Sequence, residues 1–392
     1  MSGKPPGVPL APWDGCPLSR RTFVASSAAA LALLALPCRV AFSQDLRYGF
    51  LRPRPALFFE SLKDGLVKCQ LCPRGCETLD GERGECGVRE NRQGKYFTLA
   101  WGNPCAVHVD PIEKKPFFHV LPGSSSYSIA TAGCNLHCKF CQNWEISQAR
   151  PEKTYNFDLP PDQVVARARE MGCPSIAHTY VEPLVFYEYM QEVGRLAKPT
   201  GILNICHSAA YVNPGPLEAL CDVLDAAVID LKSFDATFYQ DLCGADLEPV
   251  LDSLKILRRR RVHVEIVNLV IPQFNDAPDL VTRMCAWIRE ELGPLTPLHF
   301  SRFYPLYKMQ NHYPTPVSTL ERCRDLARKA GLKYVYIGNL PGNEAESTFC
   351  HGCGKRIIER TGYRLGEVKM KNGACGHCGA AIPGLWQRPG KV

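Results

Sequence analysis

Between residues 123 and 341, short apolar runs alternate with segments whose apolar residues recur every three or four positions. This alternation predicts strands and helices in turn, and therefore a parallel sheet. The predicted strands are Ser128–Thr131, Ser175–Tyr180, Ile202–Cys206, Ala227–Leu231, Val262–Val270, Leu298–Phe303 and Tyr334–Ile337. The predicted helices are Pro161–Met171, Leu184–Ala197, Pro216–Leu224, Leu247–Arg259, Pro278–Glu291 and Thr319–Ala330. We expect an α/β fold, built as a partial (βα)6 barrel like an incomplete TIM barrel.

Composition adds that the chain is an ordinary globular protein with metal-binding features. Its 392 residues are 45% hydrophobic and 22% charged, which suits one large domain with smaller appended modules. The net charge of +7 is mild, and the dense basic run Arg258–Arg261 ends a predicted helix without interleaved aromatic residues. We therefore expect no nucleic-acid partner. Eleven of the 20 cysteines fall in three groups with metal-ligand spacing, which favours metals over disulfides.

The central cysteine group follows the first strand of the predicted barrel. Cys134, Cys138 and Cys141 have the spacing C-x3-C-x2-C, with Phe140 before the third cysteine. Such a loop can hold three irons of a cubane iron–sulfur cluster and leave the fourth iron open to a small molecule. A cluster used only for electron transfer would be better held by four cysteines. A zinc knuckle or a chance grouping is the alternative interpretation.

This three-cysteine loop resembles the signature of the radical S-adenosylmethionine (SAM) superfamily. The resemblance implies an enzyme whose [4Fe-4S] cluster binds SAM through its amino and carboxylate groups. One electron then cleaves SAM to methionine and a 5′-deoxyadenosyl radical, which takes hydrogen from a substrate. A flavodoxin- or ferredoxin-like reductant is expected to supply that electron. Cys134, Cys138 and Cys141 would then be both the cluster ligands and the catalytic centre.

Polar residues at the ends of three predicted strands suggest a SAM pocket. Thr179–Pro183 is similar to the superfamily's Gly-Gly-Glu-Pro motif, although both glycines are replaced, and this implies that Glu182 lies near the SAM amino group. Asp230-Leu231-Lys232 resembles the Asp-Leu-Lys of glycyl-radical activating enzymes, whose side chains lie near the SAM carboxylate. Asn204, His207 and Ser208 are expected at the ribose or at a proton-transfer site. The alternative for Lys232 is a structural ion pair with Asp230.

The first 43 residues resemble a twin-arginine signal segment. Arg20 and Arg21 precede an apolar stretch from Phe23 to Cys38, and small residues follow at Ala41–Ser43. The apolar stretch is too short to span a membrane comfortably. The signal predicts export to the periplasm or membrane, whereas SAM chemistry suggests the cytoplasm, so both locations stay open.

Two further modules flank the predicted barrel. In residues 44–122, Cys69, Cys72, Cys76 and Cys86 have the spacing C-x2-C-x3-C-x9-C, which suits zinc or an auxiliary iron–sulfur cluster, with disulfides as the alternative. The run Asp110–Pro116 is expected to link this module to the barrel. In residues 342–392, Cys350, Cys353, Cys375 and Cys378 form two C-x2-C knuckles that predict a zinc-ribbon-like module. We expect this ribbon to lie outside the barrel.

Taken together, these motifs resemble the radical SAM member of the AmmeMemoRadiSam system. The residues that carry the resemblance are Cys69–Cys86, Asp110–Pro116, Thr131–Gln142, Asp230–Lys232, Tyr334–Asn339 and Ile382–Trp386. It implies Memo-like and AMMECR-like partner proteins, and the chain is similar in turn to pyruvate formate-lyase activating enzymes.

Two alternatives stay open. The first is an activating enzyme for a glycyl-radical enzyme. Those activases commonly insert ferredoxin-like cysteine runs after the first motif, whereas here the isolated Cys173 is the next cysteine after Cys141. The second is a non-catalytic electron-transfer or scaffold protein that holds iron–sulfur and zinc.

Overall fold

The computed structural model describes residues 46–388, which belong to one compact unit. The predicted signal segment lies outside the described residues. Within the described part of the chain, every helix is too short or too polar to cross a lipid bilayer.

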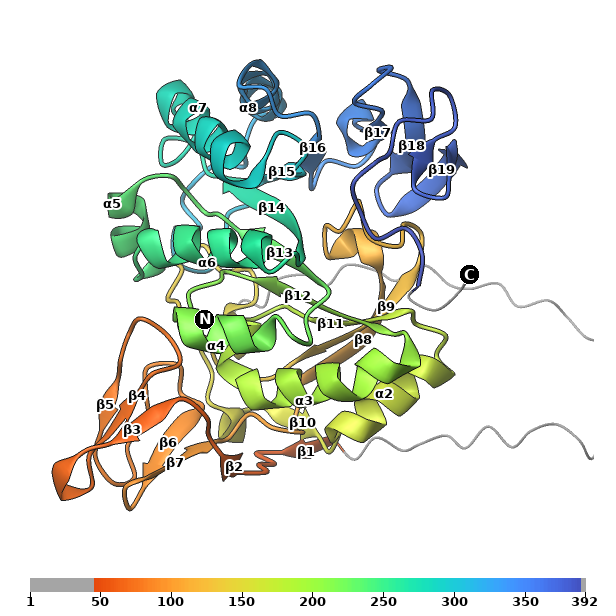
Figure 1. Cartoon of the computed structure of the whole chain (residues 1–392). Coiled ribbons are helices and arrows are strands. Elements are labelled where there is room, and N and C mark those ends of the chain that lie inside the picture. The colour runs from red at the N-terminus through yellow and green to blue at the C-terminus, as the bar shows by residue number, and fades with distance from the viewer. Residues whose placement is uncertain (1–45, 389–392) are drawn as a thin grey trace, which may run out of the picture. The chain divides into compact units, whose positions relative to one another are not determined.

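An eight-stranded sheet runs through the centre of the unit (Figure 1). From one edge to the other, its strands are β16 (Val335–Gly338), β15 (Leu298–Arg302), β14 (His263–Val270), β13 (Ala226–Asp230), β12 (Leu203–Ser208), β11 (Ser175–His178), β9 (Ser125–Ala130) and β8 (Ala106–Pro111). The seven strands from β9 to β16 are parallel, and β8 pairs antiparallel with β9 at the edge. The predicted α/β fold with a parallel sheet is confirmed. Its closure into a partial (βα)6 barrel stays a prediction, and the sheet holds one parallel strand more than that unit requires.

Helices connect successive parallel strands. They are α2 (Pro161–Glu170), α3 (Tyr187–Ala197), α4 (Pro214–Leu220), α6 (Glu248–Arg259), α7 (Pro278–Trp287) and α8 (Val317–Lys329). Each buries an apolar stripe; in α6 the stripe is Val250, Leu251, Leu254 and Leu257. Burying one such side chain contributes about 1.5–3 kcal/mol, so this stripe holds the helix on the sheet.

The helix boundaries differ from the predicted ones where helix geometry changes. The helix predicted from Leu184 begins as a 3-10 turn, Pro183–Phe186, before α3. The helix predicted from Pro216 begins two residues earlier, because Pro214 occupies its first turn. The predicted helix Pro278–Glu291 is α-helical only as far as Trp287, and its last turn belongs to a π-helical segment, Ile288–Leu292.

On the sheet face away from the helices, a buried apolar segment covers part of the strands. Its residues Ile112, Phe117, Val120 and Leu121 pack in one cluster with strand residues of alternating position: Ala177, Leu203, Ile205, Ala226, Val228 and Val267. The segment predicted as a linker is therefore part of the core. Successive strand residues point to opposite faces, so the residues between these contact the helices instead.

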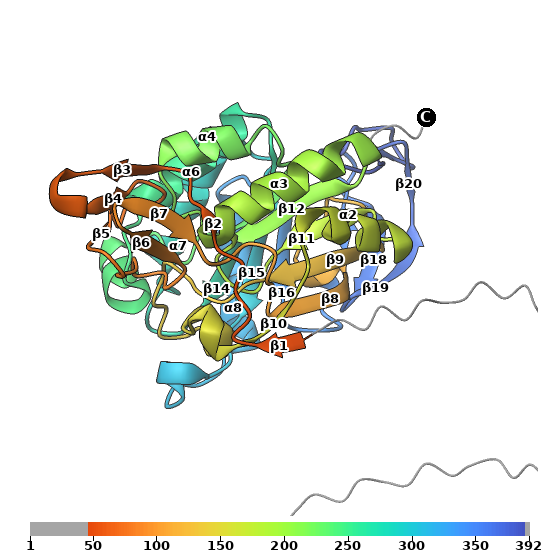
Figure 2. The same cartoon turned by 90° about the horizontal axis from the view of Figure 1, so that it is seen from below.

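The two cysteine-rich regions fold into small antiparallel sheets. Strands β2 (Arg54–Pro55), β7 (Lys95–Thr98) and β6 (Arg89–Arg92) form one sheet, and β3 (Phe59–Ser61), β4 (Val67–Cys69) and β5 (Glu77–Thr78) form a second. Strands β17 (Thr348–Phe349), β18 (Arg356–Thr361) and β19 (Arg364–Val368) form the C-terminal sheet, followed by the pair β20 (Met370–Lys371) and β21 (Ala374–Cys375). A last pair joins β1 (Leu46–Tyr48) to β10 (Tyr155–Phe157). Seen from below, the sheets of residues 54–98 lie on one side of the central sheet and β18–β20 on the other (Figure 2).

Candidate active site

A pocket of about 480 Å³ lies on the face of the central sheet away from the helices. Its walls come from strand residues such as His207, Asp230, Leu269 and Ser301, which share the side of their strands that does not contact the helices. They lie further along the strands than the buried apolar cluster on the same face. The carboxyl ends of parallel strands are where α/β enzymes build their sites, so this pocket is the candidate active site.

Cys134, Cys138 and Cys141 all line this pocket, on the loop that follows β9. The loop is fixed from two sides. Its backbone donates from His137 N and Lys139 N to the carbonyls of Cys243 and Leu242, each at 2.8 Å. The Cys141 thiol lies 3.3 Å from the Ser147 hydroxyl. The three thiols converge on one cavity without forming a compact single-ion group, which fits a cluster that binds each thiolate at a different iron.

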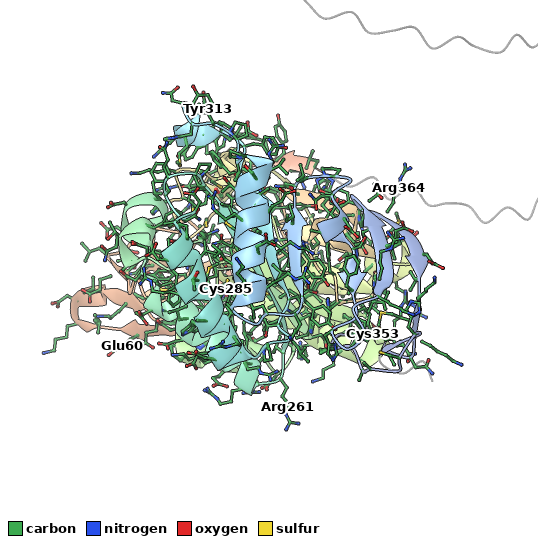
Figure 3. The ribbon with its side chains drawn as sticks, turned by 90° about the horizontal axis from the view of Figure 1, so that it is seen from above. Glu60, Arg261, Cys285, Tyr313, Cys353 and Arg364 are labelled. Carbon is green, nitrogen blue, oxygen red and sulfur yellow. The ribbon has the colours of Figure 1, made fainter. Side chains whose placement is uncertain are left out.

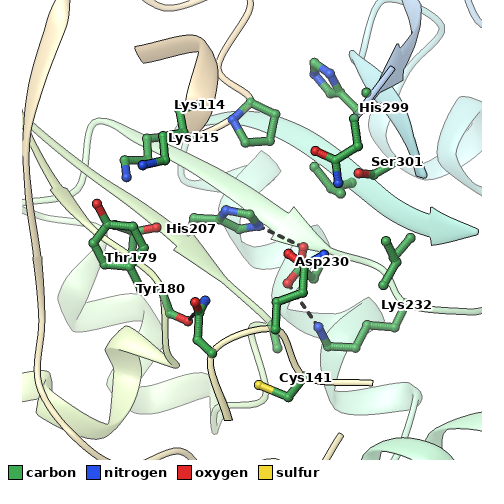
Figure 4. A pocket seen from close by; sticks show the side chains of 18 of the residues that line it. Lys114, Lys115, Cys141, Thr179, Tyr180, His207, Asp230, Lys232, His299 and Ser301 are labelled. Atoms are coloured by element: carbon green, nitrogen blue, oxygen red, sulfur yellow. Dashed lines mark hydrogen bonds and ion pairs between the residues drawn. The ribbon is translucent and has the colours of Figure 1, made fainter. Parts of the chain in front are cut away.

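Next to the cysteine loop, Asp230 joins two basic side chains (Figure 4). His207 Nε2 lies 2.8 Å from one carboxylate oxygen of Asp230, and Lys232 Nζ lies 3.0 Å from the other. Burial raises the pKa of Asp230, but Lys232 and His207 outweigh that effect and hold it well below its usual range. Burial lowers the pKa of Lys232, but Asp230 and Cys138 raise it well above its ordinary value. Both groups are therefore charged at neutral pH, and Lys232 is an ammonium beside the cysteine loop.

Glu182 occupies the wall between the cysteine loop and β12. It is buried, lines the pocket, and accepts hydrogen bonds from Leu184 N at 3.1 Å, Ser208 Oγ at 2.6 Å and Ala209 N at 2.8 Å. Burial raises its pKa, and these donors oppose that rise. Ser208 does not line the pocket, so it acts on the site through Glu182 rather than by contacting a ligand.

Asn204, which we predicted to bind the cofactor, does not line this pocket. Its side chain is buried away from the pocket, where it contacts His178 Nε2 at 2.8 Å and donates to the Val223 carbonyl at 2.8 Å. Asn204 and His207 are three positions apart on one strand, so they point to opposite faces of the sheet. Only His207 reaches the pocket.

The sequence prediction missed a charged cluster on another wall of the pocket. Asp110 accepts from Lys114 Nζ at 2.8 Å, from Lys115 Nζ at 2.5 Å and from the Tyr180 hydroxyl. Lys115 is almost completely buried, and its ammonium lies 4.0 Å from the centre of the Tyr180 ring. Lys114, Lys115 and Tyr180 line the pocket. Lys115 within the run Asp110–Pro116 was the signal for this cluster, because a lysine that becomes buried needs a carboxylate partner, and Asp110 lies five residues before it.

Tyr180 also occupies the position of the first glycine in the Gly-Gly-Glu-Pro motif that Thr179–Pro183 resembles. Its φ is +69°, in the left-handed region that glycine adopts most easily, and its carbonyl accepts from Asn143 Nδ2 at 2.6 Å. The backbone therefore keeps a glycine-like turn while the phenol reaches Asp110. A non-glycine residue held in this region is a feature of functional sites.

The C-terminal module also reaches the pocket, contrary to the expectation that it lies outside the barrel. Glu346, Gly362 and Tyr363 line the pocket. The buried Arg360 donates to the Phe118 carbonyl at 2.8 Å and to Thr348 Oγ1 at 2.6 Å. The module is thus a wall of the candidate site.

Four cysteines of this module form a compact group. The thiol groups of Cys350, Cys353, Cys375 and Cys378 lie within 4.8 Å of one another, with 3.6 Å between Cys350 and Cys378 and 3.8 Å between Cys353 and Cys375. Thiolates around a tetrahedral zinc ion, at Zn–S distances of about 2.3 Å, stand roughly 3.8 Å apart. The geometry fits one such ion. Cys353 and Arg364 mark this module in Figure 3, on the side of the molecule away from Glu60 of β3.

Comparison of the sequence with known proteins identifies the family of the chain. The family model of the radical SAM superfamily matches residues 128–283. An uncharacterized protein of Methanocaldococcus jannaschii, MJ0808, is 43% identical over 331 residues, which cover 84% of this chain and 98% of that protein. The chain belongs to the radical SAM superfamily. The family implies a [4Fe-4S] cluster and SAM, and the three thiols around the pocket are suited to that cluster.

Other members of this superfamily are more distantly similar. The pyruvate formate-lyase 1-activating enzyme of Escherichia coli is 22% identical over 218 residues, which cover 52% of this chain and 89% of that enzyme. A radical SAM methyltransferase from Sphaerobacter thermophilus is 13% identical, with a TM-score of 0.45 over 78% of this chain and 81% of that one. The relation to activating enzymes is thus one of homology within the superfamily.

Proposed function

We propose that this chain is an oxidoreductase that cleaves SAM reductively and uses the resulting radical to abstract hydrogen from a protein or small-molecule substrate. The observation that carries the proposal is that Cys134, Cys138 and Cys141 line one pocket together with Glu182 and the Asp230–Lys232 pair. Three thiolates leave one iron open, and charged groups beside it match a ligand that carries an amino and a carboxylate group.

Different residues of the pocket bind the carboxylate and the amino group of SAM. Lys232 is the cation for the SAM carboxylate, and Asp230 fixes that ammonium in place while His207 fixes Asp230. Glu182 receives the SAM amino group on a carboxylate oriented by Ser208 and Ala209. When bound, the cluster and SAM supply the radical chemistry, and the protein positions both reactants and shields the radical from water.

We assign the substrate to the part of the pocket lined by Lys114, Lys115, Tyr180 and Tyr363, whose walls come from the N-terminal region, the barrel and the C-terminal module. The resemblance of the whole chain after residue 50 to the AmmeMemoRadiSam system supports Memo-like and AMMECR-like proteins as partners. A flavodoxin- or ferredoxin-like protein is the proposed reductant.

The second candidate function is activation of a glycyl-radical enzyme. The homology to pyruvate formate-lyase activating enzymes supports it. The lack of a ferredoxin-like cysteine run after Cys141 favours another substrate.

We also propose zinc at Cys350, Cys353, Cys375 and Cys378, because their spacing fits a tetrahedral ion. The arginine pair Arg20-Arg21 supports export, and SAM chemistry supports the cytoplasm.

The cluster assignment is tested by reconstitution of the protein with iron and sulfide without oxygen. The reduced protein should give an electron paramagnetic resonance (EPR) signal of a [4Fe-4S] cluster that changes shape when SAM is added. Cys138→Ala should lose this SAM-responsive signal and keep its zinc. The matched control is Cys323→Ala, since Cys323 is also buried but lies on α8 outside the pocket. A SAM-responsive cluster in Cys138→Ala would contradict the assignment.

A further inference from the structure

Two buried hydrogen-bond donors without a partner lie in the module that contains Cys69, Cys72, Cys76 and Cys86. Cys69 is buried on β4, and its backbone N–H donates to the Cys76 carbonyl at 2.8 Å. Cys72, Cys76 and Cys86 are partly exposed. The Cys76 thiol lies 3.5 Å from the backbone nitrogen of Glu85, the residue before Cys86, so the two ends of the cysteine motif lie close together.

The first unused donor is the Tyr96 hydroxyl. Tyr96 is 1% exposed, and its hydroxyl has no hydrogen-bond partner among the described residues. Both this oxygen and the Cys76 thiol lie within 3.4 Å of the position that a Cβ on Gly84 would occupy. A buried hydroxyl without a partner costs about 1–3 kcal/mol, so its position beside a thiol indicates an acceptor that belongs there.

The second unused donor is Arg89 Nε. Arg89 is also 1% exposed; its terminal nitrogens bind Glu188 and the Leu57 carbonyl, but Nε–H has no partner within residues 46–388. Burial lowers the pKa of Arg89, but Glu188, Cys69 and Cys86 raise it above its ordinary value. The Arg89 guanidinium lies 5.5 Å from the centre of the Tyr96 ring, so both unpartnered donors lie in one region of this module. Two buried donors without partners beside the cysteines call for an anionic, acceptor-rich ligand.

The spacing of the thiols decides between one metal ion and a cluster. Across the described chain, Cys350, Cys353, Cys375 and Cys378 are the one group whose donor atoms are close enough for a single tetrahedral ion. The thiols of Cys69, Cys72, Cys76 and Cys86 are more widely spread. A cubane cluster takes such a spread, because each thiolate binds a different iron, and its sulfur atoms accept hydrogen bonds.

We propose that Cys69, Cys72, Cys76 and Cys86 hold a second iron–sulfur cluster, which receives hydrogen bonds from Tyr96 and Arg89 and relays electrons to the cluster that binds SAM. The relay rests on the proposed SAM cleavage, whereas the second cluster stands on the geometry of its own module. Four cysteines close this cluster, so it transfers electrons and binds no substrate.

The packing of the two cysteine regions supports the relay. A Cβ on Gly133, the residue before Cys134, would lie 2.5 Å from the Cys86 carbonyl oxygen, so the two loops touch at the backbone. Arg74 Nε donates to the Asn135 carbonyl at 2.5 Å, which ties the loop of Cys72 and Cys76 to the residue after Cys134.

A second bridge joins the same loops at their edge. His137 Nε2 lies 2.9 Å from Glu85 Oε2, which connects residues next to Cys138 and Cys86. In both cysteine groups one thiol is buried, Cys69 in the first and Cys138 in the second, and the other thiols are partly exposed.

The electron count of the relay is simple. A one-electron donor of the flavodoxin or ferredoxin class would supply the electron at the group held by Cys69, Cys72, Cys76 and Cys86. The electron would pass to the group held by Cys134, Cys138 and Cys141, and from there to SAM. There it would break the C5′–S bond, giving methionine and the 5′-deoxyadenosyl radical, and no proton would move.

The first test counts metals in the whole chain after anaerobic reconstitution. The wild type should hold about eight irons and one zinc, and Cys72→Ala/Cys86→Ala should hold about four irons and one zinc. Cys323→Ala is the control and should match the wild type. About four irons with two zincs in the wild type, or unchanged iron in the double variant, would overturn the second cluster. None of these counts depends on SAM, so they stand whether or not SAM is cleaved.

The second test uses Tyr96→Phe, which keeps all four cysteines. Removing a hydrogen bond to a cluster sulfur should lower the midpoint potential of the SAM-insensitive EPR signal and leave the iron content unchanged. Tyr127→Phe is the control, since Tyr127 is also a buried tyrosine, on β9 of the central sheet. An unchanged midpoint potential in Tyr96→Phe would overturn the position of the cluster beside Tyr96.

The third test concerns the relay. In Cys72→Ala/Cys86→Ala, reduced flavodoxin should reduce the SAM cluster at least ten times more slowly than in the wild type, as followed by rapid-freeze EPR. Wild-type rates in the double variant would overturn the relay.

Discussion

At the scale of single residues, Lys232 has two neighbours that suggest different roles. It pairs with Asp230, as a structural interpretation requires, and it also lines the pocket beside Cys138 and lies 5.8 Å from the Phe140 ring. The sequence could predict this position because Asp230 and Lys232 are two residues apart at the end of a strand. The sequence could not predict which of Asn204 and His207 reaches the pocket. The alternation of side chains along a strand puts these two residues on opposite faces of the sheet, but it does not say which face holds the pocket.

Lys232→Ala tests the role of this ammonium. Removing a charged hydrogen-bond donor from a buried site should weaken SAM binding by roughly 2–4 kcal/mol, which is a rise in dissociation constant on the order of 30-fold or more. The iron content should not change, since Lys232 is not a metal ligand. Binding titrations of the reconstituted protein measure the effect.

The control for this variant is Lys255→Ala, which removes an exposed lysine from an ion pair with Asp252 on α6. It should leave SAM affinity unchanged. If Lys232→Ala lowers the melting temperature but binds SAM as tightly as the wild type, then Lys232 has only the structural role.

At the scale of elements, the strands and helices were predictable because their patterns are local. The segment after β8 was not, since its apolar residues and its charges serve two purposes at once. Phe117 packs into the core under the sheet, whereas Lys115 lines the pocket and pairs with Asp110. The apolar residues of this segment recur neither at every second position, as in a strand, nor every 3.6 positions, as in a helix. The sequence pattern therefore predicted a linker.

Asp110→Asn tests how this segment is held. The substitution leaves the buried Lys115 ammonium without its anion, and breaking a buried pair in this way costs about 3–5 kcal/mol of unfolding free energy. Asp252→Asn is the matched control, because it breaks an exposed pair and should barely change the melting temperature.

The loss should depend on pH. Burial lowers the pKa of Lys115 to about 8, although Asp110 raises it, so the pKa falls further in Asp110→Asn. Below pH 8 the wild-type Lys115 is protonated and paired, whereas the variant must bury an unpaired charge or stay neutral. The gap in unfolding free energy should therefore widen as pH falls below 8 and narrow above it. A gap that does not change between pH 6 and 9 would show that Lys115 is not the group responsible.

At the scale of the whole molecule, the candidate site is assembled from parts of the chain that are far apart in sequence. Arg360 and Phe118, 242 positions apart, bring the C-terminal module onto the segment after β8, and Tyr363 thereby reaches the pocket. The cysteine spacing was enough to predict the module itself. Its place on the pocket depends on buried long-range contacts that no local pattern encodes.

The measurement that tests the account most directly is formation of 5′-deoxyadenosine from SAM by the reconstituted, reduced protein, followed by chromatography. The wild type and Cys323→Ala should form 5′-deoxyadenosine and methionine in equal amounts, and Cys138→Ala should form neither. If the cluster-loaded wild type produces no 5′-deoxyadenosine while it binds SAM, or if Cys138→Ala produces it at the wild-type rate, the proposed SAM cleavage at this pocket is contradicted.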